Sequence, residues 1–167
     1  MYDRLTASDI KKMEDEIRYR KLNLRKELIE DVKDARAQGD LSENFEYYAA
    51  KREKNKNESR IRFLERMIKT AQVIDDSSCD NEVGMNDRVE VVYEEDGVIE
   101  SYRIVTTVRA NSLKGLVSIE SPLGKALLGK SEGDRVEVKV NASYSYFLTI
   151  QKIEKIDDDS EDQIRSY

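Results

Sequence analysis

Apolar residues in the first part of the chain recur at a spacing that predicts a long amphipathic helix. From Ile10 to Ala35 the steps between them are three or four residues, apart from one step of seven between Ile17 and Leu24. Such spacing places apolar side chains on one face of a helix. Thr6 with Asp9 three residues later fits a helix start, and Gly39 fits a helix end. The apolar positions are Ile10, Met13, Ile17, Leu24, Leu28, Val32 and Ala35.

A second apolar series predicts a second helix. Lys54 and Asn57 interrupt this series and make its middle polar. Neither segment contains proline, and the glycine between them is Gly39. We therefore expect an antiparallel helical hairpin with about 30 residues, or roughly 45 Å, per helix. A hairpin that long buries only one stripe of side chains per helix. We therefore expect that it serves to carry its tip to a distant site. The series consists of Tyr47, Ala50, Ile61, Leu64, Ile68 and Ala71.

After Ile74 the helical spacing gives way to short alternating segments. A polar stretch over residues 77–84 is typical of a linker. The pattern then predicts strands over residues 88–93, 102–108, 116–119, 135–140 and 144–153, a turn at 95–97 and a short helix over 123–128. The acidic residues 156–167 are expected to form a disordered tail. The expected fold class is α+β with two domains: a hairpin over 1–76 with its tip at 39–44, and a β-rich domain over 85–155.

Composition and charge exclude several classes of function. The chain has 29 basic and 35 acidic residues, and residues 1–80 hold 18 of each, so the negative excess lies in the second part. Nucleic-acid binding in general needs clustered Lys and Arg, which this balance disfavours. Without histidine and with Cys79 as the only cysteine, histidine-based catalysis, an internal disulfide and a Cys-x-x-Cys metal motif are excluded.

No apolar run approaches the length of a membrane span, and the segment Met1–Ile10 lacks the apolar core of a signal peptide. We expect a cytoplasmic protein that does not associate with membranes.

The predicted turn between the helices carries two acids, Asp40 and Glu43, in the run Gly39-Asp40-Leu41-Ser42-Glu43-Asn44. Asp-x-x-Glu at a helix start is also a capping box, and local chemistry alone favours that interpretation. The alternative is that the tip delivers two carboxylates to a metal site, since hard oxygen ligands suit Mg²⁺. The two interpretations are partly compatible, because a capping carboxylate can rotate onto a metal.

Other candidates carry weaker signals. Arg36, Arg52 and Arg60 lie on the hairpin and are candidates to face an anionic strand, although a solvated face of mixed charge is favoured. Tyr47 and Tyr48 are candidates to stack on bases, although Tyr47 fits the apolar seam. In the second part, Pro122, Leu123 and Leu127 form either an apolar docking patch or the packed face of a short helix.

The chain resembles the bacterial GreA/GreB transcript-cleavage factors over roughly residues 3 to 155. Three blocks carry the likeness, and their order and spacing agree throughout. The first is the tip run with Glu46-Tyr47 and Ala49-Ala50. The second is Ala71 to Asp75. The third comprises Tyr102-Arg103-Ile104-Val105, then Ile119, Ser121-Pro122-Leu123, Ala126 to Lys130, and Gly133-Asp134.

The resemblance implies a coiled-coil hairpin followed by a domain like the FK506-binding fold. It also implies docking of that domain, through Ser121, Pro122 and Leu123, on the rim of the secondary channel of bacterial RNA polymerase. Asp40 and Glu43 would then enter the channel and help to hold a second Mg²⁺, so that the polymerase cleaves backtracked RNA near its 3′ end. A chain of this type has no cofactor of its own and no complete active site, and we expect a monomer.

Three features depart from the pattern of the family. Phe45 stands where a small residue is usual, Asn141-Ala142-Ser143 replaces a Pro-Gly-Gly turn, and an acidic extension follows Lys155. The alternatives to a cleavage factor are a regulator of the same architecture that inhibits the polymerase, an independent isomerase or nuclease, and a coiled-coil adaptor.

Overall fold

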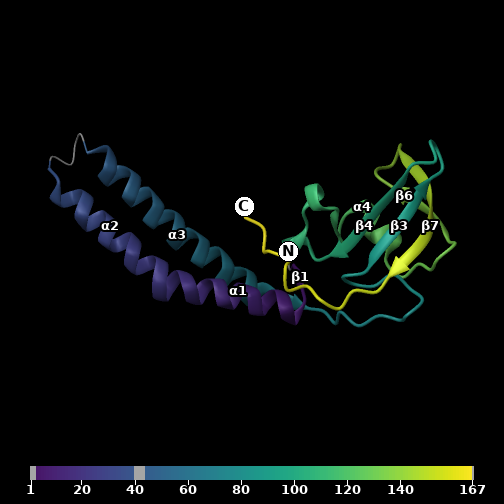
Figure 1. The fold of residues 1–167 in the computed structure, drawn as a ribbon, viewed down its shortest axis with the longest axis horizontal. Coiled ribbons are helices and arrows are strands. Elements are labelled where there is room, and N and C mark those ends of the chain that lie inside the picture. The colour runs from purple at the N-terminus through teal and green to yellow at the C-terminus, as the bar shows by residue number, and fades with distance from the viewer. Residues whose placement is uncertain (1–2, 40–43, 167) are drawn as a thin grey trace. The chain divides into compact units, whose positions relative to one another are not determined.

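The structure of the chain, a computed structural model, describes residues 3–39 and 44–166 and contains two compact units (Figure 1). The first unit is built from Ile10–Ala71, and the second combines Arg4–Asp9 with the residues from Gln72 onward. The sequence-based boundary at residue 76 had assigned the whole N-terminal part to the hairpin. The structure assigns Arg4–Asp9 and the residues from Gln72 to the second unit instead, because strand β1 (Arg4–Leu5) pairs in parallel with strand β2 (Gln72–Val73). Arg4 lies opposite Gln72 in this pair.

The first unit is the predicted helical hairpin. Its first arm comprises α1 (Ala7–Tyr19), a π-helical turn η1 (Arg20–Leu24) and α2 (Arg25–Ala37), and its second arm is α3 (Phe45–Thr70). Figure 1 shows α2 and α3 running side by side. Thr6 and Asp9 form the expected capping box, since the amide of Asp9 donates to Thr6 Oγ1 and the amide of Thr6 to Asp9 Oδ2. The predicted stripes supply Met13, Ala35, Tyr47, Ile61 and Leu64 to the buried interior.

The first arm contains a π turn that the apolar spacing did not predict. The amide of Arg25 donates to the carbonyl of Arg20, one residue further back than in an α-helix. This turn lies in the seven-residue gap between Ile17 and Leu24. Arg20 occupies the gap and is drawn into the hairpin by Asn57, whose Oδ1 accepts from Arg20 Nη1 at 3.0 Å. A polar pair thus replaces an apolar contact at this level of the hairpin.

The second unit is a five-stranded mixed sheet in the order β5-β4-β3-β7-β6. Its strands are β3 (Arg88–Tyr93), β4 (Ile99–Val105), β5 (Leu116–Ser118), β6 (Arg135–Lys139) and β7 (Ser145–Glu154). Strands β4 and β5 pair in parallel and the other neighbours are antiparallel, with a register shift between Glu90 and Val91. Each of these five strands lies within a few residues of its predicted position, and the expected fold class is confirmed.

One short helix, α4 (Pro122–Leu127), packs on this sheet, and two 3-10 turns, η2 (Thr107–Arg109) and η3 (Ser112–Lys114), connect β4 to β5. Alternate residues of the strands bury their side chains with Leu127 in one apolar core. The buried members are Val83, Met85, Val89, Val91, Ile104, Ile119, Leu127, Val136, Val138, Leu148 and Ile150.

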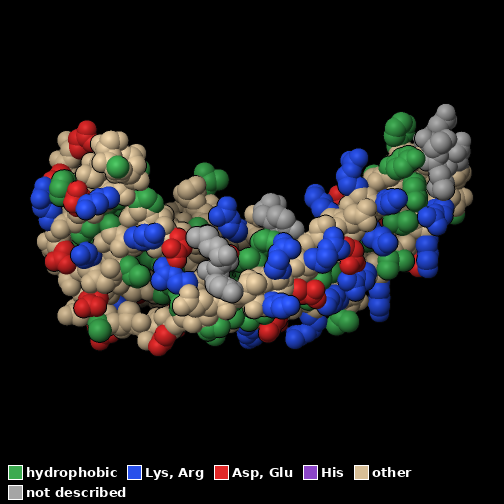
Figure 2. All heavy atoms as spheres, turned by 180° about the vertical axis from the view of Figure 1, so that it is seen from behind, with side chains coloured by type: hydrophobic (Ala, Val, Ile, Leu, Met, Phe, Trp, Pro, Cys, Tyr) green, Lys and Arg blue, Asp and Glu red, His purple; other side chains and the backbone are tan. Residues whose placement is uncertain are grey.

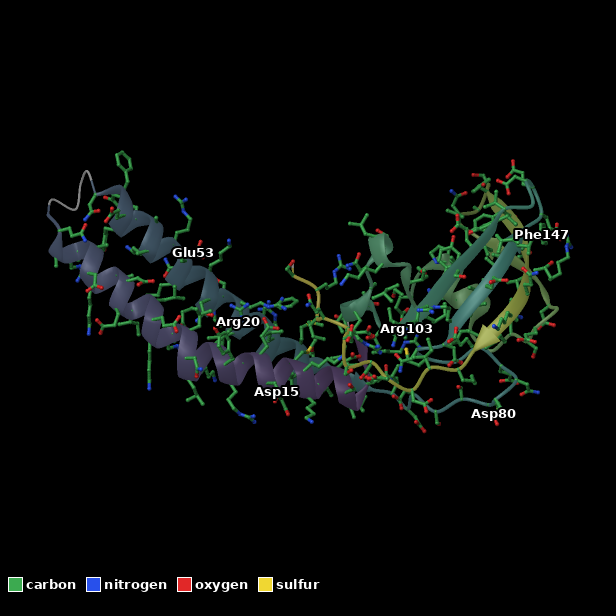
Figure 3. All side chains as sticks on the ribbon, in the orientation of Figure 1. Asp15, Arg20, Glu53, Asp80, Arg103 and Phe147 are labelled. Atoms are coloured by element: carbon green, nitrogen blue, oxygen red, sulfur yellow. The ribbon has the colours of Figure 1, made fainter. Side chains whose placement is uncertain are left out.

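Residues 156–166 lie against the second unit, although composition predicted a disordered tail. Asp162 accepts hydrogen bonds from Arg103 and Arg109, and the amide of Arg165 donates to the carbonyl of Val108 at 2.7 Å. An acidic segment is expected to be disordered when its carboxylates have no cationic partner. Here Arg103 and Arg109 of the same unit bind the carboxylate of Asp162. Figure 3 shows Arg103 beside this part of the chain.

Within residues 3–39 and 44–166, none of the helices combines the length and the apolarity that crossing a bilayer requires.

Candidate functional site

The two tip acids, Asp40 and Glu43, lie outside the described residues, so the geometry of the candidate site rests on the residues that flank them. Helix α2 ends at Ala37, and Gly39 has a positive φ of 138°. On the other side Asn44 precedes α3. In the sequence, the tip run lies between the end of α2 and the start of α3.

Asn44 is the N-cap of helix α3. Its Oδ1 accepts from the amide of Tyr47 at 3.0 Å, and its Nδ2 donates to the carbonyl of Ala35 at 2.5 Å. One side chain thus caps α3 and ties it to the last turn of α2. A capping box would have required Asp40 at the N-cap, four residues earlier than the observed cap. The N-cap of α3 is therefore Asn44, and Asp40 lies outside the described residues.

A second contact joins the two helices just below the tip. Arg36 Nη2 donates to the hydroxyl of Tyr47 at 3.3 Å, and the Arg36 guanidinium lies 5.5 Å from the centroid of the Tyr47 ring. The hydrogen bond from Arg36 lowers the pKa of the Tyr47 phenol below its ordinary value. Tyr47 is buried in the seam, as its spacing suggested, so it is not available for stacking on a base.

The three arginines predicted as candidates to face RNA differ in their surroundings. Arg36 and Arg52 are exposed on the hairpin, and Figure 2 shows many Lys and Arg side chains along this unit. Arg60 is only 8% exposed and binds Glu16 through Nε at 2.9 Å. The prediction that Arg60 faces an anionic RNA strand is therefore wrong. Its guanidinium lies inside the hairpin, where the carboxylate of Glu16 on the facing helix balances its charge.

Two aromatic side chains near the tip are exposed. Phe45, the first residue of α3, is 86% exposed, and Tyr48 is 47% exposed. They are three residues apart on one helix and so lie on the same face.

The predicted docking residues form the start of α4. Ser121 caps this helix by accepting from the amide of Gly124 at 3.0 Å, and its hydroxyl donates to the carbonyl of Ser118 at 2.7 Å. Pro122 is exposed in the first turn, where its missing N–H costs nothing. Leu123 is half-buried against the core, and Leu127 is fully buried in it. Of the apolar patch, Leu127 thus serves the core, and Pro122 with the outer part of Leu123 remains on the surface.

The described residues contain no cluster of three or more Cys, Asp or Glu side chains placed to hold a metal. Cys79 is exposed and free in the linker region.

A buried ionic cluster in the second unit was not predicted. Arg109 is fully buried, and its Nε lies 2.6 Å from Asp9 Oδ1 while its Nη1 donates to Asp162 Oδ2 at 2.8 Å. Arg103 Nη1 also donates to Asp162, at 2.6 Å. Asp9 and Asp162 are far from the two arginines in the sequence, and no local pattern signals their association.

The sequence matches two models of one protein family. Residues 4–73 match the N-terminal domain described as "Transcription elongation factor, N-terminal", and residues 78–155 match "Transcription elongation factor, GreA/GreB, C-term". The tip acids and the docking segment lie within these two ranges, and the tail after residue 155 lies outside them.

Relatives of known name agree with this match. The transcription elongation factor GreA of Lachnoclostridium phytofermentans is 42% identical over 151 residues, which cover 89% of this chain and 94% of that protein. GreA of Bacillus subtilis is 43% identical over 81% of this chain and 86% of that protein. A crystal structure of the GreA factor homolog Gfh1 of Thermus thermophilus gives a TM-score of 0.43 at 24% identity, covering 93% and 100% of the two chains. On the family match and the identity to the two GreA proteins, this chain belongs to the GreA/GreB family of transcription elongation factors.

Proposed function

We propose that the chain binds bacterial RNA polymerase as a monomer and stimulates the polymerase's own cleavage of backtracked RNA. The second unit docks on the rim of the secondary channel through Ser121, Pro122 and Leu123. The hairpin places its tip in the channel, near the 3′ end of the RNA. The chain is an activator without an active site or a cofactor of its own, and a cytoplasmic location follows from this partner.

The observation that carries the proposal is the construction of the tip. Asn44 caps α3 and binds α2, so the ends of both helices are fixed by a residue other than the two acids. Asp40 and Glu43 lie in the sequence between these fixed ends. The proposal assigns their carboxylates to a function outside the hairpin.

The donor set fits Mg²⁺, which binds through one or two carboxylates and keeps several waters. Asp40 and Glu43 would help to hold a second Mg²⁺ in the polymerase, and such an ion would supply stabilisation of the charge that develops as water displaces the leaving oxygen at phosphorus. Asp40 and Glu43 supply negative charge that raises the occupancy of this ion, and their remaining oxygens accept hydrogen bonds from water. Two carboxylates alone are too few to hold the ion firmly, so the activity requires the polymerase.

The test uses stalled, backtracked elongation complexes and measures release of 3′ RNA fragments. Addition of the wild-type protein should accelerate release. Asp40→Asn and Glu43→Gln should each remove at least about 10-fold of the stimulation, because each deletes one negative charge from the metal site. Both variants should still bind polymerase.

Glu46→Gln is the matched control. Glu46 is exposed in the first turn of α3, and its substitution removes one negative charge close to the tip without touching either acid. We expect Glu46→Gln to stimulate cleavage like the wild type. No stimulation by the wild-type protein would refute the proposal, and slower cleavage than that of polymerase alone would identify an inhibitor of the same architecture.

A further inference from the structure

The tail of the second unit lines a groove, and two arginines bind one of its carboxylates beside it. The groove is lined by residues 109–114, 116–118 and 121, and tail residues 161–166 form its other wall. Asp162 of the tail is 7% exposed at its side chain and lies between two guanidinium groups. Its two oxygens accept from Arg103 Nη1 at 2.6 Å and from Arg109 Nη1 at 2.8 Å. Charge-assisted hydrogen bonds of this kind are the strong ones.

Both arginines are held in place by groups outside the tail. Arg109 Nη1 also donates to Asn86 Oδ1, and Arg109 Nε lies 2.6 Å from Asp9 Oδ1. Arg103 Nε donates to the carbonyl of Asn86 at 3.0 Å. The two side chains therefore need no tail to keep their positions. The tail also supplies Asp159, whose Oδ2 lies 3.9 Å from Arg109 Nη1. Without the tail, the two guanidinium groups would face the carboxylate of Asp9, which leaves a site with positive charge.

The rest of the tail is attached through polar groups. Asp159 Oδ2 lies 3.9 Å from Arg109 Nη1, the carbonyl of Asp158 accepts from Arg103 Nη2 at 3.1 Å, and the amide of Arg165 donates to the carbonyl of Val108 at 2.7 Å. Residues 161, 163, 165 and 166 are exposed, and a cavity of about 800 Å³ remains between the tail and the groove. A segment attached through polar groups at an exposed surface opens locally more readily than one packed in the apolar core.

The groove borders the candidate docking segment. Ser121, which caps α4, lines the same cavity as tail residues 161–166. A partner that reaches Ser121 and Pro122 therefore meets the groove and the tail together.

We propose that this groove is a binding site for an acidic segment of RNA polymerase, and that the tail is its internal competitor. The inference rests on the proposed function, because it takes the partner from it. A site that is open only part of the time shows an affinity reduced by the open fraction. Weakening the tail should therefore tighten binding to the polymerase.

The first test compares full-length Asp162→Asn with full-length Asp157→Asn in binding to core RNA polymerase, at fixed salt concentration. Both variants lose one negative charge from the tail, but Asp157 is exposed and lies outside the Asp162 cluster. Asp162→Asn should bind several-fold to about tenfold more tightly than the wild type, and Asp157→Asn should bind like the wild type. Equal affinities of the two variants would overturn the proposal.

A second variant covers the case in which Asp162→Asn unfolds the second unit. Arg165→Pro removes the amide that donates to Val108 and leaves Arg103 and Arg109 untouched. It should also bind polymerase more tightly than the wild type. Unchanged or weaker binding by folded Arg165→Pro would count against the tail as a competitor.

A third measurement tests the carboxylate site of the groove independently of the proposed function. A synthetic peptide of residues 156–167 should bind full-length Arg165→Pro in a titration that weakens with salt. The same peptide carrying the substitution Asp162→Asn should bind at least about 10-fold more weakly, because it lacks the charge-assisted hydrogen bonds. Equal binding of the two peptides would refute a carboxylate site. The wild-type protein could fail to bind polymerase while the two peptides still bind the groove with different affinities. That result would refute the proposed function and the polymerase as ligand, but the groove would remain a carboxylate-binding site.

Discussion

At the scale of single residues, Gly124 fixes the shape of the docking segment. A Cβ built on Gly124 would lie 1.9 Å from the carbonyl oxygen of Ser118. Since the obstructing atom belongs to the backbone, a side chain at this position must displace α4 or the end of β5. We expect Gly124→Ala to destabilise the second unit by about 1–3 kcal/mol, the usual cost of overpacking. Chemical denaturation monitored by circular dichroism measures this loss.

Lys125→Ala, in the next position of the same helix, is the control, because Lys125 is exposed and its truncation creates no clash. It should change the free energy of unfolding by less than about 0.5 kcal/mol. A Gly124→Ala variant as stable as Lys125→Ala would mean that the backbone at Ser118 relaxes freely and that the docking segment is not rigid.

The sequence predicts the burial of some single residues and not of others. The pattern placed Tyr47 in the seam correctly, because helical spacing reports which side of a helix is buried. For Pro122, Leu123 and Leu127 it left docking and core packing open, and the structure places Leu127 in the core. The pattern did not separate Arg60 from Arg52. Both are arginines of one helix, and only the position of Glu16 on the facing helix makes Arg60 an interior residue. Partners from distant parts of the chain decide the role of a charged side chain.

At the scale of elements, a polar cluster stabilises the hairpin at its π turn. Glu16 Oε1 accepts from both Arg20 and Arg60, and Asn57 accepts from Arg20 (Figure 3 labels Arg20). Burial opposes ionisation of Glu16, but the hydrogen bonds from Arg60 and Arg20 outweigh it and lower the pKa of its carboxyl. The ionised carboxylate therefore favours the folded hairpin.

The sign of the pH dependence follows from this lowered pKa. A group with a lower pKa in the folded state contributes its full stability above its ordinary value, 4.5 for Glu16, and loses the contribution as the pH falls through the folded value. Glu16→Gln should lower the free energy of unfolding by about 1–3 kcal/mol at neutral pH, since two arginines lose a charged partner. The difference between wild type and variant should shrink below pH 4.5.

Thermal unfolding followed by helical circular dichroism from about pH 3 to pH 7 measures this difference. Glu14→Gln is the control, because Glu14 is an exposed acid of the same helix. A deficit of Glu16→Gln that stays constant over the whole pH range would show that packing, and not the charge of Glu16, supports the π turn.

Elements differ in how far the sequence predicts them. Strands β3 to β7 follow alternating patterns of several residues, so their positions could be predicted to within a few residues. Strands β1 and β2 have two residues each and carry no periodicity, so their pairing was missed and with it the N-terminal boundary of the second unit. The π turn was missed because its cause, Asn57, lies on the other helix.

At the scale of the whole molecule, the proposed function assigns docking to the second unit and stimulation of cleavage to the tip of the hairpin. These two tasks can then be separated by mutation. An Asp40→Asn protein retains the docking segment and loses one tip carboxylate, so it should occupy polymerase without stimulating cleavage. Mixed with the wild-type protein, it should compete for the polymerase.

The competition experiment adds increasing Asp40→Asn to backtracked complexes that contain a fixed, saturating amount of wild-type protein. Cleavage should fall by half when the two proteins are present at about equal concentration, if their affinities are equal. The double variant Asp40→Asn/Pro122→Glu should compete at least about 10-fold less effectively, because a charge placed in an apolar contact must be desolvated without a partner. Pro122 is exposed in the first turn of α4, where glutamate is compatible with the helix, so the added charge acts on docking and not on folding. Equal competition by the single and the double variant would remove Pro122 from the docking surface, and no competition by either would show that the tip itself is required for binding.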